Sequence, residues 1–269
     1  MQDIRDSLFK PLAGHRFRAV LLTERAGVLA GTGEAKCAAA ELGLNWESEL
    51  PEGSPLDAGQ IFATLTGTPK QLAEAEERII GTLSKPSGIA TAAARAIALA
   101  DGQIEIVSGS WKKMPPCMKQ IVRGAITTGG ASFRICEPPM LYMDKNFVAM
   151  FGSVAKTLKA AAGIHDVTKI IQIRGERASI TQETEAALAG GADILMVDTG
   201  EIADFSACTQ RLNELHAREK VRVAFAGNVK IGDIPAMAAR GVDILCIGKE
   251  IVDAPLLDMK LNVIGEVKK

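Results

Sequence analysis

The strongest structural signal lies in Val221-Arg-Val-Ala-Phe-Ala-Gly227-Asn228 and in Gly241-Val-Asp-Ile-Leu-Cys-Ile-Gly248-Lys249. Each stretch is a short apolar run that ends in glycine immediately before a segment of helical composition. The runs do not alternate with polar residues, which indicates strands buried on both faces, as in a parallel sheet covered by helices. The two stretches therefore predict two consecutive βα units of an α/β domain.

The same pattern continues toward the N-terminus as far as residue 102. We expect this region to hold successive strands separated by helices. A complete eight-stranded α/β barrel occupies ~250 residues, so the region predicts either an incomplete barrel of about six strands or an open sheet. The expected strands span 104–107, 140–143, 169–173, 194–197, 221–225 and 242–247, and the expected helices span 112–127, 153–162, 181–189, 204–215 and 233–239.

The first hundred residues follow a different pattern. Short β-like runs at 17–22, 27–30 and 60–65 are separated by turn-forming segments, with helical composition at 34–42 and 70–83. Ser87 is expected to cap the start of a further helix that runs to residue 100. The sequence thus predicts an N-terminal α+β domain over residues 1–100 and an α/β domain over residues 101–269.

The composition disfavours several classes of protein. Lys and Arg number 31 against 32 Asp and Glu, a net charge of -1, so no nucleic-acid-binding field is expected. The apolar runs are shorter than the ~18 residues of a membrane span, and the N-terminus lacks a signal-peptide pattern. Five cysteines without a CxxC pair predict reduced thiols, and the three histidines lack metal-ligand spacing. We expect a cytoplasmic protein with reduced thiols.

Glycine stands at the end of both of the last two expected strands. In parallel α/β barrels this arrangement lets backbone N–H groups approach a phosphate at the start of a helix. The alternative is that both glycines only form tight βα turns. The predicted phosphate-binding residues are Gly227, Asn228, Gly248 and Lys249.

Cationic side chains recur just after the expected strands. Because the carboxyl ends of parallel strands meet at one edge, such cations would form a site for carboxylate or phosphate groups. The alternative is a scatter of surface charges. The residues are Lys112, Lys113, Arg134, Lys145, Arg174, Arg177 and Lys249.

Asp198 ends the expected strand 194–197. At that place a carboxylate holds a ribose hydroxyl or a phosphate-bound Mg²⁺, or else caps the next helix. Gly129-Gly130, before Arg134, is either a helix C-cap with a turn or a ligand-binding loop. No Ser/His/Asp or Cys/His arrangement is visible, so no covalent catalysis is expected.

Several landmarks along the chain match one family. They are the stretch 52–67, Glu77-Arg78, Ser87-Gly-Ile-Ala-Thr91, Gly129-Gly130 with Arg134, Asp198, the stretch 226–228 and the stretch 256–259. Together they resemble the quinolinate phosphoribosyltransferases, also called nicotinate-nucleotide pyrophosphorylases. The resemblance begins near Ala26 and covers most of the chain.

The resemblance implies an N-terminal α+β domain, a partial α/β barrel of about six strands, and a homodimer in which the partner completes the barrel mouth. The family joins quinolinic acid to phosphoribosyl pyrophosphate with Mg²⁺, and releases pyrophosphate and carbon dioxide. By resemblance the catalytic residues are Lys112, Arg134 and Asp198, with Asp198 also the candidate metal ligand. The predicted substrate-binding residues are Arg78, which the resemblance implies, and Trp111, Phe133, Lys145 and Arg174, which stand at or near family site positions.

The sequence departs from the family pattern at the expected site. Positions where the family has other charged or polar residues hold Trp111, Phe133, Asp144, Phe147 and Ala224. Trp111 and Phe133 predict a less anionic, more apolar aromatic ligand stacked in the mouth, or a filled pocket.

Three functional hypotheses follow. The first is a pentosyltransferase that joins an aromatic or heterocyclic carboxylate, similar to quinolinate, to phosphoribosyl pyrophosphate. The second is a non-catalytic binding or regulatory paralogue that keeps a phosphate site. The third is quinolinate activity itself, with Lys113, Lys145 and Arg174 in place of the missing cations.

Overall fold

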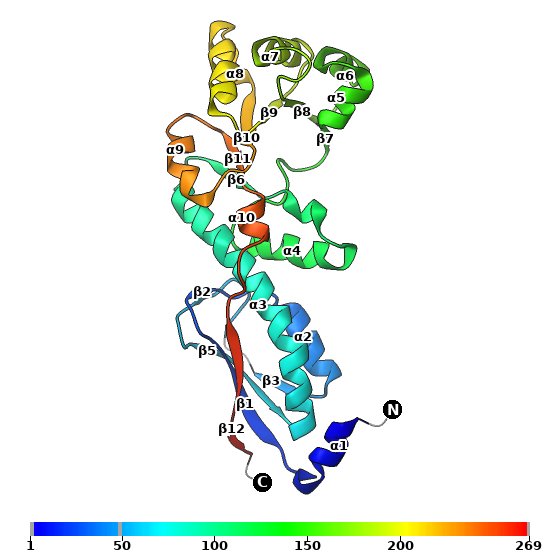
Figure 1. The fold of residues 1–269 in the computed structure, drawn as a ribbon, viewed down its shortest axis with the longest axis vertical. Coiled ribbons are helices and arrows are strands. Elements are labelled where there is room, and N and C mark those ends of the chain that lie inside the picture. Colours follow the sequence, from blue (N-terminus) through cyan, green and yellow to red (C-terminus); the bar gives the residue numbers. More distant parts are fainter. Residues whose placement is uncertain (1–2, 48–49, 268–269) are drawn as a thin grey trace. The chain divides into compact units, whose positions relative to one another are not determined.

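The computed structural model describes residues 3–47 and 50–267, and the chain forms two compact units (Figure 1). Unit 1 comprises Met1–Arg95, Trp111–Gly130 and Ile251–Lys269, and unit 2 comprises Ala96–Ser110 and Ala131–Glu250. A single cut at residue 100 therefore does not describe the division. Two segments that follow residue 100 in the sequence belong with the N-terminal residues.

Unit 1 is built on a four-stranded antiparallel sheet in the order β12-β1-β5-β3. Buried side chains of this sheet pack with those of α2 and α3 in one apolar core. Its strands are β1 (Phe17–Thr23), β3 (Asn45–Glu47), β5 (Ile61–Gly67) and β12 (Met259–Glu266), with β2 (Gly27–Val28) and β4 (Pro55–Leu56) as a separate pair; its helices are α1 (Ile4–Leu8), η1 (Lys10–Leu12), α2 (Thr32–Glu41), α4 (Pro116–Thr128) and most of α3 (Pro69–Ala100).

The C-terminal strand β12 joins unit 1 because it pairs along the whole of β1, with Leu261 opposite Leu21. Met259 and Leu257 are buried in the same core. This pairing moves the C-terminal residues out of the predicted domain 101–269. It joins opposite ends of the chain, so no local pattern in the sequence indicated it.

Helix α3 runs without a break through Pro86. The prediction that Ser87 caps a new helix is therefore wrong. Ser87 is fully buried inside α3, where its Oγ accepts a hydrogen bond from the backbone N–H of Ala30 at 2.9 Å and donates to the carbonyl of Ala30 at 3.2 Å. A Cβ on Gly88 would overlap the carbonyl of Pro255. The Ser-Gly pair thus joins α3 closely to its neighbours in unit 1.

Unit 2 is built on a six-stranded parallel sheet in the order β6-β11-β10-β9-β8-β7. The six predicted strands are confirmed, and β6 and β7 lie at the two edges, so the sheet stays open as an incomplete barrel. β8 is buried throughout Ile170–Ile173 and β9 throughout Ile194–Val197, as expected of strands covered on both faces. The strands are β6 (Glu105–Val107), β7 (Met140–Met143), β8 (Thr168–Ile173), β9 (Ile194–Asp198), β10 (Arg222–Ala226) and β11 (Ile244–Cys246).

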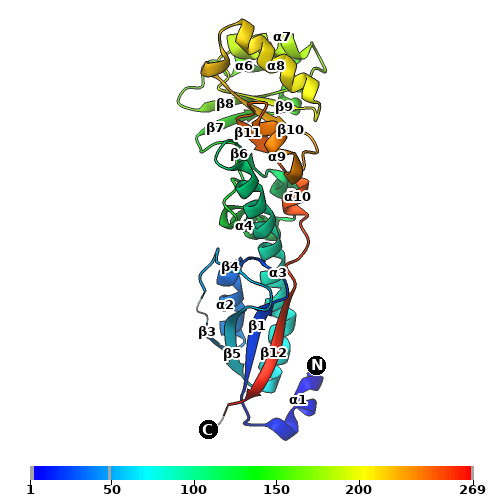
Figure 2. The ribbon, with the colours of Figure 1, turned by 90° about the vertical axis from the view of Figure 1, so that its left-hand side faces the viewer.

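Helices follow β7, β8, β9, β10 and β11 of unit 2 as predicted for successive βα units, whereas α4, which follows β6 in the sequence, belongs to unit 1. α7 and α8 lie side by side (Figure 2). In the part of the chain that the structure describes, no helix is long and apolar enough to cross a membrane. The helices are α5 (Lys145–Phe151), α6 (Val154–Ala160), α7 (Ile180–Ala189), α8 (Ile202–Glu214), α9 (Ile234–Ala238) and α10 (Lys249–Val252), with η3 (Arg218–Lys220) and η4 (Ile231–Asp233), while η2 (Ser110–Lys113) spans the boundary of the units.

Candidate active site

The carboxyl ends of the parallel strands bring most of the predicted site residues of unit 2 to one edge. β9 and β10 are in register, with Asp198 opposite Ala226, so the turns that follow them are neighbours. Residue 132 forms a parallel bridge with Val107 at the end of β6, and its carbonyl accepts from Ser108 N at 2.8 Å. The predicted residues at this edge are Phe133, Arg134, Lys145, Arg174, Asp198, Gly227, Asn228, Gly248 and Lys249.

Asp198 is contacted by Gln172 of β8 and by Arg174, the residue that follows β8. The amide Nε2 of Gln172 donates to its Oδ2, and Nη1 of Arg174 lies 3.3 Å from the same oxygen. Arg174 Nη1 also donates to the Asp198 carbonyl at 2.8 Å. The N-cap of α8 is Glu201, so the alternative that Asp198 caps this helix is wrong. Asp198 is an oriented carboxylate with 32% of its side chain exposed.

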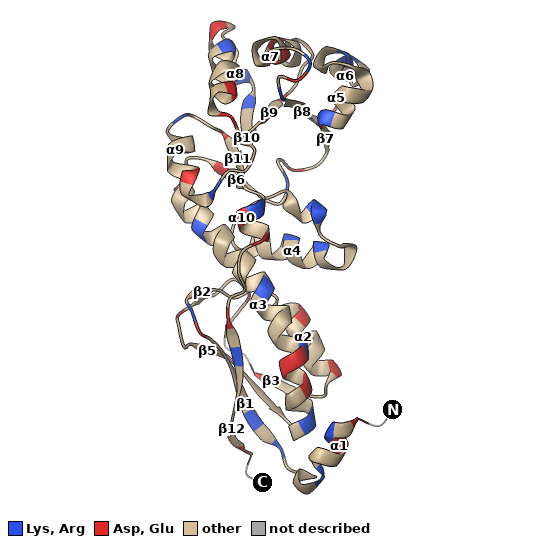
Figure 3. Cartoon of the chain, in the orientation of Figure 1, with Lys and Arg blue, Asp and Glu red and all other residues tan. Residues whose placement is uncertain are grey.

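Arg174 is engaged by carboxylates rather than extended into solvent. Its Nε donates to Glu176 Oε1 at 2.7 Å, in addition to its contacts with Asp198. The hydrogen bond that Arg174 donates to Glu176 and the charges of Glu176 and Asp198 raise the pKa of the Arg174 guanidinium, and Arg174 in turn lowers the pKa of Glu176. Both signs of charge occur along the elements of this unit (Figure 3).

Two residues of this network were not predicted from the sequence. Gln172 is 6% exposed, and its Oε1 accepts from Lys145 N at 2.5 Å. Glu183, on the first turn of α7, accepts from the backbone N–H groups of Arg174 at 2.8 Å and Gly175 at 2.9 Å. A polar amide within the apolar run 169–173 was the available signal for Gln172. An acid in the first turn of a helix is common, so Glu183 carried no distinctive signal.

The turn after β10 brings two stretches of backbone into close contact. Gly227 has φ of +120° and Asn228 has φ of +54°, both in the left-handed region. A Cβ on Gly227 would overlap the backbone of Gly200, in the turn after β9. A Cβ on Gly248 would instead overlap the side-chain Oγ of Ser110. Backbone packing therefore accounts for Gly227, and the predicted phosphate role of both glycines stays a prediction.

Phe133 and Arg134 form one local group. The Arg134 guanidinium carbon lies 4.9 Å from the centre of the Phe133 ring, a distance at which a cation and an aromatic face attract each other. Ser132 fixes this turn, because its Oγ donates to the Arg134 carbonyl at 2.7 Å. Gly129 is the C-cap of α4, as the simpler of the two interpretations predicted.

Three predicted site residues belong to unit 1. Arg78, on α3, forms an ion pair with Glu41 of α2. Trp111 packs under the guanidinium of Arg123, which lies 4.9 Å from the ring centre. Lys112 lies beside Trp111 in η2. Their predicted part in the site stays a prediction.

The described residues do not form a cluster of protein ligands that could hold a metal ion without a substrate. They contain no group of three or more His, Cys, Asp or Glu side chains placed to hold a metal ion. Asp198 Oδ2 faces a guanidinium and an amide N–H. Asp144 caps α5, with its Oδ1 accepting from Asn146 N at 2.8 Å. The predicted role of Asp198 as a ligand of diphosphate-bound Mg²⁺ stays a prediction.

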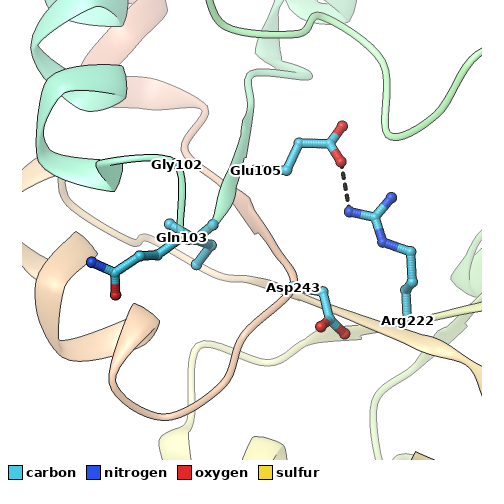
Figure 4. A pocket seen from close by; sticks show the side chains of 6 residues that line it. Gly102, Gln103, Glu105, Arg222 and Asp243 are labelled. Atoms are coloured by element: carbon cyan, nitrogen blue, oxygen red, sulfur yellow. Dashed lines mark hydrogen bonds and ion pairs between the residues drawn. The ribbon is translucent and has the colours of Figure 1, made fainter. Parts of the chain in front are cut away.

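A shallow hollow lies at the opposite, amino end of the sheet (Figure 4). Its charged side chains are engaged with one another or with backbone: Arg222 pairs with Glu105 at 2.6 Å, and Asp243 accepts from Val223 N at 2.6 Å. The lining residues are Gly102, Gln103, Ile104, Glu105, Arg222 and Asp243.

The chain matches one protein family along almost all of its length. Residues 6–87 match the model for the N-terminal domain of quinolinate phosphoribosyl transferase, and residues 89–262 match the model for its C-terminal domain. The nicotinate-nucleotide pyrophosphorylase [carboxylating] of Rattus norvegicus is 30% identical over 255 residues, covering 93% of this chain and 82% of the relative. A probable enzyme of the same name from Archaeoglobus fulgidus is 27% identical over 248 residues, covering 91% and 94%.

Solved structures show the same fold at lower sequence identity. The nicotinate-nucleotide pyrophosphorylase from Francisella tularensis superimposes with a TM-score of 0.80 at 21% identity, covering 97% of this chain and 94% of that one. The corresponding protein from Ehrlichia chaffeensis gives a TM-score of 0.84 at 17% identity, covering 97% and 92%. With both domain models matched in order, this chain belongs to the quinolinate phosphoribosyltransferase family.

Proposed function

We propose that the protein is a pentosyltransferase that joins quinolinate, or a closely similar aromatic carboxylate, to phosphoribosyl pyrophosphate. Pyrophosphate leaves C1 of the ribose, the ring nitrogen of the acceptor bonds to that carbon, and the neighbouring carboxylate departs as carbon dioxide and is replaced by a proton. The match to both family domains carries this proposal. The oriented carboxylate of Asp198 at the carboxyl edge supports it. The alternative of a non-catalytic paralogue is not favoured.

The strand ends suggest a division of roles. Asp198 has an accessible carboxylate for the ribose hydroxyls. The turns at Gly227-Asn228 and Gly248-Lys249 offer backbone N–H groups and a cation for the 5′-phosphate. Within unit 2, Arg134 and Lys145 are assigned to the anionic groups of the acceptor and the diphosphate. Phe133 is assigned to the acceptor ring.

In this proposal the protein acts by positioning and by charge stabilisation, without a side-chain nucleophile. Holding C1 of the ribose and the ring nitrogen in contact lowers the entropic cost of the reaction. Cationic side chains held in place stabilise the negative charge that develops on the diphosphate as it leaves. Mg²⁺ is assigned to the diphosphate, where it neutralises phosphate charge, because Mg²⁺ in proteins is usually held by substrate phosphates together with one or two carboxylates.

A homodimer in the cytoplasm is the remaining part of the proposal. The five cysteines are free thiols, which supports a reducing compartment. Light scattering after size-exclusion chromatography tests the dimer, since a single peak at the mass of one chain, 28.4 kDa, contradicts it.

The decisive experiment measures pyrophosphate release from quinolinate and phosphoribosyl pyrophosphate, with the nucleotide product identified by mass spectrometry. We expect turnover by the wild-type chain and a loss of about 100-fold or more in kcat/KM for Asp198→Asn, because a hydrogen bond to an ionised group is among the stronger polar contacts. Asp243→Asn is a suitable comparison at the amino end of the sheet. No turnover of quinolinate or of other pyridine and benzene carboxylates would refute the proposal.

A further inference from the structure

The two oxygens of the Asp198 carboxylate have different surroundings. Oδ2 accepts from Gln172 Nε2 and lies 3.3 Å from Arg174 Nη1. Among the residues that the structure describes, Oδ1 accepts no side-chain hydrogen bond. With about a third of the side chain exposed, Oδ1 is the oxygen that remains available to a ligand.

Gln172 fixes which end of its amide faces Asp198. Its Oε1 accepts from the backbone N–H of Lys145 at 2.5 Å, and a backbone N–H is only a donor. The NH₂ group must therefore point toward Asp198. Gln172 is only 6% exposed, so the N–H donor that faces Asp198 Oδ2 belongs to a buried side chain.

Arg174 is fixed beside Asp198 at both its backbone and its side chain. Glu183 binds the backbone N–H groups of Arg174 and Gly175 at 2.8 and 2.9 Å. Glu176 accepts from Arg174 Nε at 2.7 Å, so the guanidinium lies between two carboxylates. Its second contact, to the Asp198 carbonyl, restricts it further.

This arrangement is unfavourable for a divalent cation on Asp198. Mg²⁺ requires oxygen ligands in near-octahedral geometry and is usually held by one or two carboxylates together with substrate phosphates. An ion bound by Asp198 would lie next to the guanidinium, and like charges at such separations repel. The positive charge that a metal would bring to this carboxylate is already present in Arg174.

We propose that Arg174 takes the place of a metal ion at Asp198: it pairs with the carboxylate, excludes divalent cations from it, and leaves Oδ1 to bind the sugar hydroxyls of the donor. Arg174 is then a positioning residue that acts through Asp198, supported by Gln172. The identity of the donor rests on the proposed function, whereas the exclusion of the metal does not.

The test measures Mn²⁺ binding by electron paramagnetic resonance in the absence of substrates. We expect wild-type protein and Asp198→Asn to give the same Mn²⁺ titration. Arg174→Gln should gain a site at least about tenfold tighter than any seen in the wild type, because it removes the positive charge that pairs with both Asp198 and Glu176. Arg174→Lys keeps the positive charge and should gain no such site.

The double variant Arg174→Gln with Asp198→Asn is the matched control, and it should lose the gained site. Wild-type binding of Mn²⁺ that Asp198→Asn abolishes would overturn the proposal, as would a folded Arg174→Gln variant that titrates like the wild type. If Arg174→Gln does not fold, the comparison of wild type with Asp198→Asn decides by itself.

Turnover separates this proposal from the proposed function. A wild-type chain that is inactive with every carboxylate refutes the function but leaves the Mn²⁺ result valid. In an active enzyme, Arg174→Gln should raise the KM for phosphoribosyl pyrophosphate more than it lowers kcat, because Asp198 loses its orientation. Arg174→Lys should restore part of that loss.

Discussion

Gly227 shows how a single residue is constrained by backbone packing. Its φ of +120° is a conformation that side chains rarely adopt, and a Cβ there would overlap the backbone of Gly200. The backbone N–H of Gly200 donates to the Ala226 carbonyl at 3.0 Å, which holds the turns after β9 and β10 together. Glycine at this position is therefore required whether or not a phosphate binds.

Gly227→Ala should lower the free energy of unfolding by about 2–4 kcal/mol. The new Cβ would overlap backbone atoms of Gly200, which cannot move aside as the end of a flexible side chain could. Gly232→Ala is the matched control: no atom lies within 4 Å of a Cβ there, and its loss should stay below about 1 kcal/mol. Urea denaturation measures both values. Equal losses for the two variants would contradict the packing argument.

Cys208 makes the stability of the protein depend on pH in the alkaline range. Burial raises the pKa of this thiol to about 11 in the folded chain, from an ordinary value of 9.0. The folded state keeps its proton where the unfolded state loses it. The thiol's contribution is thus complete below pH 9.0 and is lost as the pH rises toward about 11.

We expect the Cys208 thiol alone to remove about 2–3 kcal/mol of the free energy of unfolding between pH 9.0 and about 11, as a shift of two pKa units implies. The measurement compares the pH dependence of urea unfolding for wild type, Cys208→Ala and the exposed-thiol control Cys37→Ala. Cys208→Ala should show the shallower decline. The same slope in all three proteins would rule out Cys208 as the source.

Helix α3 illustrates, at the scale of an element, a sequence motif with two interpretations. Ser and Gly after Pro resemble a helix start, yet α3 continues and the motif lies against β2 and the segment before β12. The Ser87 hydroxyl accepts a hydrogen bond from the backbone N–H of Ala30 and donates one to the Ala30 carbonyl. Tertiary contacts thus overrode a local capping signal.

Ser87→Ala should cost about 1–3 kcal/mol of stability, because it leaves the buried N–H of Ala30 without its acceptor. Ser206→Ala, at an exposed position of α8, is the control and should change stability by less than about 0.5 kcal/mol. Thermal unfolding followed by circular dichroism distinguishes them. A neutral Ser87→Ala would show that water replaces the hydroxyl without cost.

At the scale of the whole molecule, the chain is not divided into two consecutive domains. The strand β12, from the far end of the sequence, forms one edge of the sheet of unit 1, and Trp111–Gly130 joins the same unit. Unit 1 therefore depends on the C-terminal residues. Unit 2 draws its sheet from residues 105–246.

A charge placed on β12 tests this dependence. Leu261 packs against the core of unit 1, whereas Val263 on the same strand is 56% exposed. Leu261→Asp should lower stability by about 1–3 kcal/mol, because it removes apolar contact and brings a carboxylate toward the core, and Val263→Asp should lower it by less. Denaturation curves for the two variants decide. A larger effect at Val263 would contradict the observed register.

Much of unit 2 was predictable because its signals are local. The runs at 169–173 and 194–197 are apolar at most positions, and such runs indicate strands buried on both faces wherever they occur. The position of Asp198 at a strand end followed from the same pattern. The role of Gln172 could not be predicted in this way, because no pattern in the neighbouring sequence indicates that its amide faces Asp198, 26 residues away.

The sequence alone determined that the C-terminal half consists of βα units and that glycines and charged residues follow its strands, because burial and turn formation depend on a residue and its near neighbours. Only the tertiary structure decided that Arg174 pairs with Asp198, that Ser87 lies inside a continuous helix, and that β12 joins β1. These outcomes depend on strand register and on contacts between distant segments, which form only when the sheets assemble.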